Sequence, residues 1–140
     1  MIFEHVALNV PDARAAAAWY VAHLGLEVLR ARAEPPFTQF LADETGRVFL
    51  ELYTNPADAV PDYGAQHPLR LHVAFAVEDA ASERLRLEAA GATLAKEEPQ
   101  ADGSLLIMMR DPWGVPVQLC QRRQPFWELG TELEPDGGPA

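Results

Sequence analysis

The chain repeats itself at a fixed offset, and this repeat constrains its fold more than any other feature. The segment HVALNVPDA at residues 5–13 returns as HVAFAVEDA at residues 72–80, and VFLELY at 48–53 returns as VPVQLC at 115–120. Both pairs are separated by 67 residues (72 − 5 and 115 − 48). A repeat at one offset predicts one supersecondary unit that is built twice.

Each copy is predicted to fold as a β-α-β-β-β unit, because short apolar runs alternate with turns rich in Pro, Gly and Asp. In the first copy we expect strands over residues 3–10, 26–30, 37–42 and 47–53, with a helix over 12–24. In the second copy we expect strands over 69–77, 93–96, 104–110 and 115–121, with a helix over 80–90. Asp12 and Asp79 are expected to cap the two helices, and Gly25 and Gly91 to end them.

These units predict an α+β fold of two tandem βαβββ modules. If their sheets are curved, partly open and mixed, they can surround a metal or substrate cleft. The 140 residues fit one compact domain with a sizeable core. We expect a single two-module domain over residues 1–123, made of module one (1–54), a linker (55–68) and module two (69–123). The remaining tail, residues 124–140, is expected to be mobile because it ends in a run of Pro, Asp and Gly.

Charge, cysteine count and apolar runs narrow the possible partners and the expected location of the protein. The formal net charge of −10 argues against binding to nucleic acid and to anionic membranes, which favour a basic surface. The single cysteine allows no intrachain disulfide. The longest uncharged apolar run, residues 15–22, is too short to span a bilayer. With no basic segment followed by a long apolar run at the N-terminus, we expect no signal peptide and a cytoplasmic location.

Four polar residues occupy matching positions of the repeat: His5, Glu51, His72 and Gln118. Successive side chains of a strand point to opposite faces, so all four are expected to face away from the apolar side that packs on the helices. If the two sheets curl towards each other, the four side chains would converge in one cleft. The sequence leaves open whether this cleft lies within one chain or between two subunits.

The doubled unit, with a His in each first strand and Glu or Gln in each fourth, resembles the vicinal oxygen chelate superfamily. That superfamily includes glyoxalase I, methylmalonyl-CoA epimerase, extradiol dioxygenases, fosfomycin-resistance transferases and bleomycin-resistance proteins. The segments that carry the resemblance span the chain from Ile2 to about Arg123, namely residues 5–12, 19–20, 24–26, 50–52, 72–77 and 111–119.

By this resemblance the metal ligands would be His5, Glu51, His72 and Gln118. Two imidazoles, a carboxylate oxygen and an amide oxygen suit a divalent ion such as Zn, Ni, Co, Mn or Fe(II). Glu51 is the only carboxylate of the set, so we expect it to act as the catalytic base. Gln118 occupies a position where most catalytic members carry Glu, which weighs against a symmetric two-base isomerisation.

The first function expected is that of a glyoxalase-like, metal-dependent enzyme. It would act as a lyase or isomerase and transfer a proton next to a carbonyl of a small, oxygen-rich substrate. Two alternatives stay open. One is a non-haem Fe(II) dioxygenase of the extradiol type, built on the two histidines and Glu51. The other is a non-catalytic, bleomycin-resistance-like protein that binds a drug or metabolite. The resemblance also implies a homodimer.

Four further residues are expected to line the substrate site: Arg70, Tyr53, Asn9 and Phe49. Arg70 would share a face with His72 and could hold a carboxylate or phosphate, although an exposed arginine at a strand end explains it equally well. Cys120 also falls on the face that points to the cleft, where we expect a buried and inert thiol.

Overall fold

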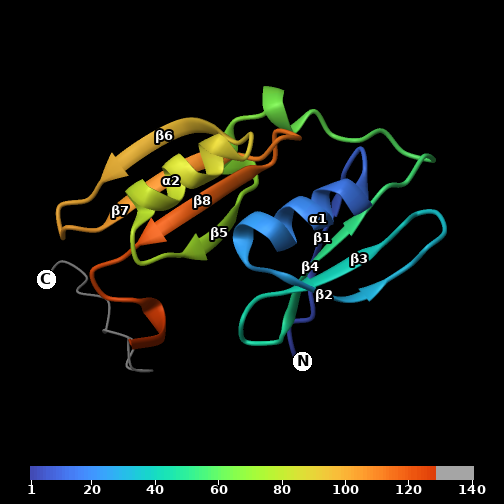
Figure 1. Cartoon of the computed structure of the whole chain (residues 1–140), viewed down its shortest axis with the longest axis horizontal. Coiled ribbons are helices and arrows are strands. Elements are labelled where there is room, and N and C mark those ends of the chain that lie inside the picture. The colour runs from blue at the N-terminus through green and yellow to red at the C-terminus, as the bar shows by residue number, and fades with distance from the viewer. Residues whose placement is uncertain (129–140) are drawn as a thin grey trace, which may run out of the picture.

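The computed structural model describes residues 1–128 and contains two four-stranded sheets, each with one helix on one of its faces (Figure 1). Module one consists of β1 (Val6–Asn9), α1 (Ala13–Leu24), β2 (Glu27–Ala31), β3 (Gln39–Ala42) and β4 (Val48–Tyr53). Module two consists of β5 (Val73–Ala76), α2 (Ala80–Ala89), β6 (Thr93–Pro99), β7 (Leu105–Arg110) and β8 (Pro116–Gln121). Two short 3-10 helices, Tyr63–Ala65 and Pro68–Arg70, lie between the modules, and a third, Phe126–Glu128, follows β8.

The two sheets have the same topology, which confirms the doubled βαβββ unit and the α+β class. Their strand orders are β1-β4-β3-β2 and β5-β8-β7-β6. In each sheet the first strand runs parallel to the fourth, and the other pairs are antiparallel. The match extends to the register, because Ala7 pairs with Glu51 in module one and Ala74 pairs with Gln118 in module two.

Both helices begin at the aspartates that the sequence indicates. The Asp12 side chain accepts hydrogen bonds from the backbone N–H groups of Arg14 and Ala15, and Asp79 accepts one from Ser82. Gly25 ends α1 with a positive φ of 67°, a left-handed conformation that glycine adopts at little cost. Neither α-helix within residues 1–128 has the length and apolar character needed to cross a membrane.

The first strand of each module is shorter than the sequence predicts. The strand expected over residues 3–10 begins at Val6, and the one expected over 69–77 begins at Val73. In the second case the 3-10 helix at Pro68–Arg70 takes up the preceding residues, because Pro68 starts the turn and the His67 side chain accepts from the Leu69 N–H group. Arg70 therefore lies on a turn and not, as expected, on a strand beside His72.

The apolar faces of the two sheets pack on their own helices. Leu8, Leu50 and Leu52 are buried in module one, and Ile107 and Leu119 are buried in module two. Glu51 and Gln118, which were expected on the opposite face, are only half-buried. Burial alternates along the second half of β4 as predicted, whereas in β8 Cys120 is buried although it shares a face with Gln118.

The modules are joined through α1. Trp19 packs against the cores of both modules, and its indole N–H donates to the carbonyl of Ala90 at 2.8 Å. The Tyr20 hydroxyl, buried on the same helix, donates to Asp111 at 2.7 Å in the β7–β8 turn. Both side chains thus fix the position of module two relative to α1.

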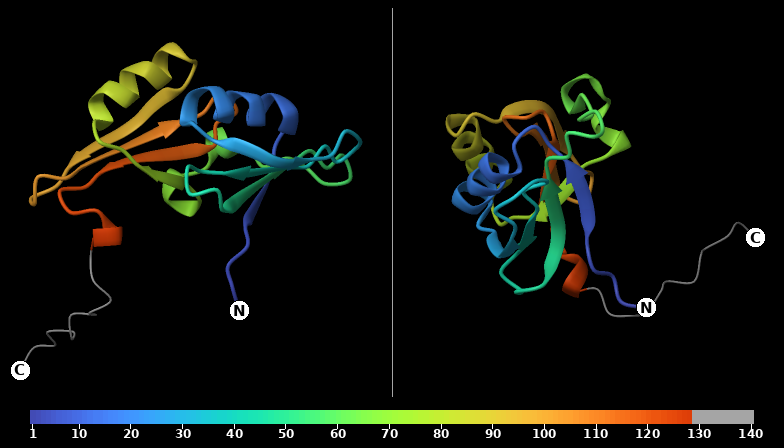
Figure 2. Two further views of the ribbon diagram at one scale, coloured as in Figure 1. Left: turned by 60° about the horizontal axis from the view of Figure 1, so that its bottom comes forward. Right: turned by 90° about the vertical axis from the view of Figure 1, so that its right-hand side faces the viewer.

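Both helices lie on the same side of the two sheets, as the two views in Figure 2 and the view in Figure 1 agree. The faces that carry Glu51 and Gln118 are the faces away from the helices. Within one chain these two faces therefore lie beside each other and do not close on one another.

The linker is fixed by hydrogen bonds to both modules. Arg110 donates to the carbonyls of Tyr63 and Gln66, and the Tyr63 hydroxyl donates to the carbonyl of Asn9. Of the tail expected over residues 124–140, the described part includes the 3-10 helix at Phe126–Glu128. Residues 129–140 lie outside the described residues, so the prediction that they are mobile stays a prediction.

Candidate metal and substrate site

The first half-site consists of His5 and Glu51. His5 stands just before β1, and Glu51 lies on β4, the strand that pairs with β1. The Nε2 atom of His5 lies 2.9 Å from Oε2 of Glu51. Both side chains are partly open to solvent, with exposed fractions of 26% and 20%. The repeat therefore brings together the first two of the four predicted ligands.

The other edge of the His5 ring is also held. Its Nδ1 atom lies 2.9 Å from Oε1 of Glu4, a residue that is itself largely exposed. The ring of Phe40 meets the imidazole edge-on, with 5.5 Å between the ring centroids and 73° between their planes. The orientation of His5 is thus defined by a carboxylate on each nitrogen and by an aromatic neighbour.

The second half-site consists of His72 and Gln118. His72 is exposed, and its Nδ1 atom lies 3.3 Å from the backbone carbonyl oxygen of Pro68. Because a carbonyl oxygen only accepts, Nδ1 carries the hydrogen and a neutral ring keeps its lone pair on Nε2. Gln118 is half-buried, and its Oε1 atom accepts a weak hydrogen bond from the Cys120 thiol at 3.5 Å.

Cys120 is buried, as the sequence predicts. Burial raises the pKa of its thiol, since desolvation disfavours the thiolate, although the nearby Arg122 acts in the opposite direction. The thiol therefore stays protonated near neutral pH, which fits an inert side chain and not a nucleophile.

The two half-sites do not combine within one chain. In residues 1–128, no group of three or more His, Cys, Asp or Glu side chains is close enough to hold a metal ion. The reason is the arrangement of the sheets, which carry their helices on the same side (Figure 2), so that the two faces away from the helices point the same way. Each chain thus presents two separate pairs of potential ligands.

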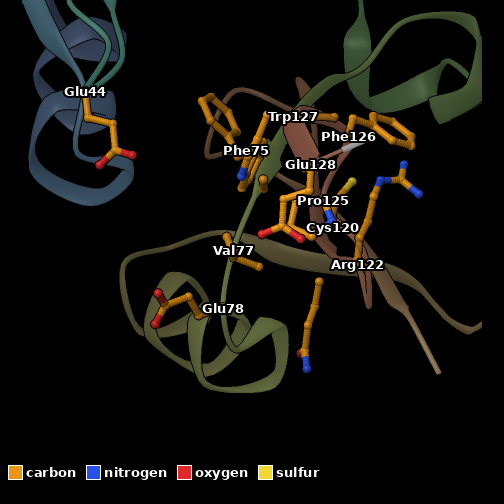
Figure 3. A pocket seen from close by; sticks show the side chains of 13 residues that line it. Glu44, Phe75, Val77, Glu78, Cys120, Arg122, Pro125, Phe126, Trp127 and Glu128 are labelled. Carbon is orange, nitrogen blue, oxygen red and sulfur yellow. The ribbon is translucent and has the colours of Figure 1, made fainter. Parts of the chain in front are cut away.

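A pocket of about 770 Å³ lies on module two, beside the second half-site. It is lined by residues of β5 and β8, by the segment 125–128 and by Glu44 of module one. In Figure 3, Phe75 and Trp127 lie on one side of this pocket, and Arg122 and Phe126 lie on the other. The volume falls in the range of 300–1,000 Å³ that is usual for small-molecule sites.

Sequence reasoning missed most of this pocket. The Arg122 guanidinium stacks on the Phe126 ring at 4.0 Å from its centroid, whereas the sequence offers only a pair of arginines at a strand end. Phe126 and Trp127 are 63% and 73% exposed. The one available signal was the Phe-Trp pair itself, since two large aromatic residues are unusual in a polar tail.

The four predicted substrate residues are dispersed. Arg70 lies on the 3-10 helix before His72. Asn9 is buried, and its side-chain oxygen accepts from the Asn55 N–H group at 3.0 Å, so it stabilises the start of the linker. Phe49 meets Phe75 edge-on, with 6.0 Å between the centroids, and so contacts a residue of the pocket wall. Tyr53, at the end of β4, is half-buried.

Comparison with known proteins gives a consistent result. The profile of the glyoxalase-like domain family matches residues 5–120. A lactoylglutathione lyase of Salmonella typhimurium is 29% identical over 134 residues, which cover 91% of this chain and 97% of that protein.

Solved structures agree with this match. The glyoxalase family protein from Enterococcus faecalis superimposes with a TM-score of 0.63 at 28% identity, over 86% of this chain and 96% of that chain. A mutant of glyoxalase I from Zea mays gives a TM-score of 0.66 at 25% identity, over 86% of this chain and 45% of that one.

Proposed function

This chain belongs to the glyoxalase-like family, and from that premise we propose that it is a metal-dependent enzyme. It would transfer a proton next to a carbonyl of a small, oxygen-rich substrate, as a lyase or isomerase does. The observation that carries this proposal is the contact between His5, just before β1, and Glu51 on β4, the two residues of module one that the family resemblance assigns as metal ligands.

The chemistry and spacing of the first half-site suit a divalent metal ion. Two donor atoms that each lie about 2.1 Å from one ion, at right angles, are about 3 Å apart. The separation of 2.9 Å between His5 Nε2 and Glu51 Oε2 agrees with that value. His72 and Gln118 would supply a second imidazole and an amide oxygen. A bound ion would polarise the substrate carbonyl and stabilise the charge that develops on its oxygen.

Glu51 is the residue that we propose as the general base. Its carboxylate is partly open to solvent, so that a substrate could reach it. The matching residue of module two, Gln118, has an amide that neither accepts nor releases a proton near neutral pH. The proton would therefore be removed and returned by the same residue, on one side of the substrate.

We further propose that a homodimer completes the site. His72 is exposed, His5 and Glu51 are partly open to solvent, and the exposed apolar side chains Ile2, Phe3 and Val6 flank His5. In a dimer with twofold symmetry, module one of each subunit would face module two of the other, giving two equivalent sites. The first half-site of one chain would then meet the second half-site of its partner.

The pocket on module two would receive the part of the substrate that does not react. It lies next to Gln118, because Ala74, which lines the pocket, is the β5 residue that pairs with Gln118. The side chains of Phe75 and Trp127 offer apolar contact area, and Arg122 offers a guanidinium for an anionic group.

Metal binding and mixed dimers test this proposal together. The wild-type protein, stripped by chelation and dialysed against Ni, Zn or Co, is expected to take up about one ion per chain. The variants His5→Ala and His72→Ala should each bind far less. Random mixing of the two variants makes about half of the dimers mixed, and one of the two sites in each mixed dimer keeps both histidines. The mixture should therefore recover about a quarter of the wild-type metal content.

Failure of either measurement has a distinct meaning. A wild-type protein that binds no metal contradicts the enzyme proposal. Metal binding without recovery in mixed dimers contradicts the shared site, as does a monomer by light scattering at micromolar concentration. The metal-loaded enzyme should then be assayed with methylglyoxal and glutathione, the reactants suggested by the name of the Salmonella relative.

A binding function without catalysis is the second candidate, and the aromatic pocket favours it. Trp127 is mostly exposed, so an apolar ligand could cover it and quench its fluorescence. A ligand that binds equally well to the metal-free protein and to the Glu51→Gln variant would support this candidate. Loss of ligand binding when the metal is removed would support the enzyme proposal.

A further inference from the structure

We propose that Glu4 is a positioning residue for His5, which it holds in the tautomer that presents Nε2 to a metal ion; this inference rests on the proposed function. Glu4 is not one of the four matching positions of the repeat, and its counterpart in module two is Leu71. Its carboxylate nevertheless lies 2.9 Å from His5 Nδ1, on the side of the ring opposite to Glu51.

The chemistry of this contact fixes which ring nitrogen is left for a metal ion. A carboxylate oxygen only accepts hydrogen bonds, so His5 Nδ1 carries the hydrogen that joins it to Glu4. Nε2 faces the Glu51 carboxylate at 2.9 Å, and a metal ion bound by both side chains would take the place of a hydrogen on Nε2 while Nδ1 keeps its own. A carboxylate behind a metal-binding histidine also makes the ring a stronger ligand, because it stabilises the positive charge that the ring shares with the ion.

Two neighbouring contacts keep Glu4 and His5 in place. Arg47, just before β4, donates to the carbonyl of Phe3 at 2.5 Å and so ties the N-terminal segment to module one. Phe40 on β3 packs edge-on against the His5 ring and limits its rotation. The contact between Glu4 and His5 therefore belongs to a segment that is fixed on both sides.

In module two the His72 ring is held through the same nitrogen, Nδ1, but by a different acceptor. There the Nδ1 atom of His72 lies 3.3 Å from the backbone carbonyl of Pro68. A neutral carbonyl is a weaker acceptor than a carboxylate, and this contact is longer than the one at His5. Glu4 thus gives the first half-site a charged support that the second half-site lacks.

The experiment compares Glu4→Ala and Glu4→Gln with the wild type by competition for Co(II) against a chelator of known affinity. We expect Glu4→Ala to weaken Co(II) binding by about 10- to 100-fold. Glu4→Gln, whose amide oxygen can still accept from Nδ1, should lie between Glu4→Ala and the wild type. Glu27→Ala is the matched control, because Glu27 is also an exposed glutamate but lies on β2, at the far edge of the same sheet. It should change the affinity by less than about twofold.

A second readout does not require metal. The nitrogen chemical shifts of His5 in the metal-free protein report which ring nitrogen carries the hydrogen. The wild type should show hydrogen on Nδ1, held by Glu4, whereas Glu4→Ala should lose hydrogen from Nδ1 and keep it on Nε2, which faces Glu51. Unchanged shifts in Glu4→Ala would overturn the inference, and so would unchanged Co(II) affinity in a wild type that binds the ion. A wild type that binds no Co(II) would contradict the proposed function while the shifts still decide the role of Glu4.

Discussion

The two modules share a topology and a strand register but differ in how they hold their candidate ligands. In module one, His5 and Glu51 touch at 2.9 Å, and Glu4 and Phe40 fix the histidine ring. In module two, His72 is exposed and its Nδ1 atom contacts the backbone carbonyl of Pro68, while Gln118 contacts the Cys120 thiol. The repeat thus preserves positions without preserving chemistry.

This difference suggests a division of labour. Module one offers a charged, preorganised pair that could bind a cation and accept a proton. Module two offers neutral ligands beside a pocket with aromatic walls. We infer that catalytic groups reside mainly in module one and that substrate selection resides mainly in module two.

Replacement of Glu51 should have the largest effect. Glu51→Gln gives both modules a glutamine at the matching position and removes the only carboxylate of the predicted ligand set. We expect kcat/KM to fall by about 10²- to 10⁴-fold, the usual contribution of a general base. The measurement is steady-state kinetics of the metal-loaded enzyme, with Glu27→Gln as the control. A Glu51→Gln enzyme with full activity would rule out Glu51 as the base.

The turns that follow β3 and β7 should differ strongly in their effect on stability. Asp111 is buried and accepts hydrogen bonds from Tyr20 and from the N–H groups of Trp113 and Val115. Asp111→Ala leaves these donors unpaired, so the free energy of unfolding should fall by about 2–4 kcal/mol.

Asp43, the first residue of the corresponding turn in module one, is the control for this prediction. Within residues 1–128 its side chain accepts only from Thr45, in an exposed turn, and Asp43→Ala should cost about 1 kcal/mol or less. Urea denaturation measures both values. Equal losses for the two variants would show that the contact of Asp111 with α1 does not stabilise the joined modules.

Replacement of Gln118 by Glu should strengthen metal binding by the second half-site. Gln118→Glu places a carboxylate in the second half-site and makes the two modules chemically alike. Because a carboxylate is a stronger ligand for a divalent cation than an amide, we expect metal to bind about tenfold more tightly. Competition with a chelator gives the affinity. Weaker binding in Gln118→Glu would mean that Gln118 does not face the metal.

The smallest effect expected concerns pH. Burial raises the pKa of Asp111 above its ordinary value, although the hydrogen bonds from Tyr20 and from the backbone act in the opposite direction. The folded protein therefore holds the Asp111 proton more tightly than the unfolded chain does. Its contribution to stability is fully present below the unfolded pKa, near 3.9, and decreases as pH rises through the folded pKa.

Asp111→Asn should remove this pH dependence, because the amide does not titrate. Urea denaturation of both proteins from pH 3.5 to 7 should show that the variant gains stability relative to the wild type as pH rises. A constant difference across this range would contradict the raised pKa of Asp111.

Much of the fold could be predicted from the sequence because it depends on local rules. The offset between the copies, the capping aspartates and the alternation around Glu51 and Gln118 each depend on a few neighbouring residues. The strand expected over 69–77 was too long, because a proline turn overrides the apolar pattern there. The role of Phe126 and Trp127 could not be predicted, because the Phe-Trp pair is unusual in a polar tail but does not indicate which part of the fold it contacts.

The sequence alone determined two similar modules and the face of each sheet on which His5, Glu51, His72 and Gln118 lie. Only the tertiary structure decided that His5 meets Glu51 while neither meets His72 within the described chain. The physical reason is that the facing of a side chain follows from the strand period of two, which is local. The relative position of the two modules depends instead on how α1 packs against both of them. Trp19 and Tyr20 make these contacts, with residues that are far away in the sequence.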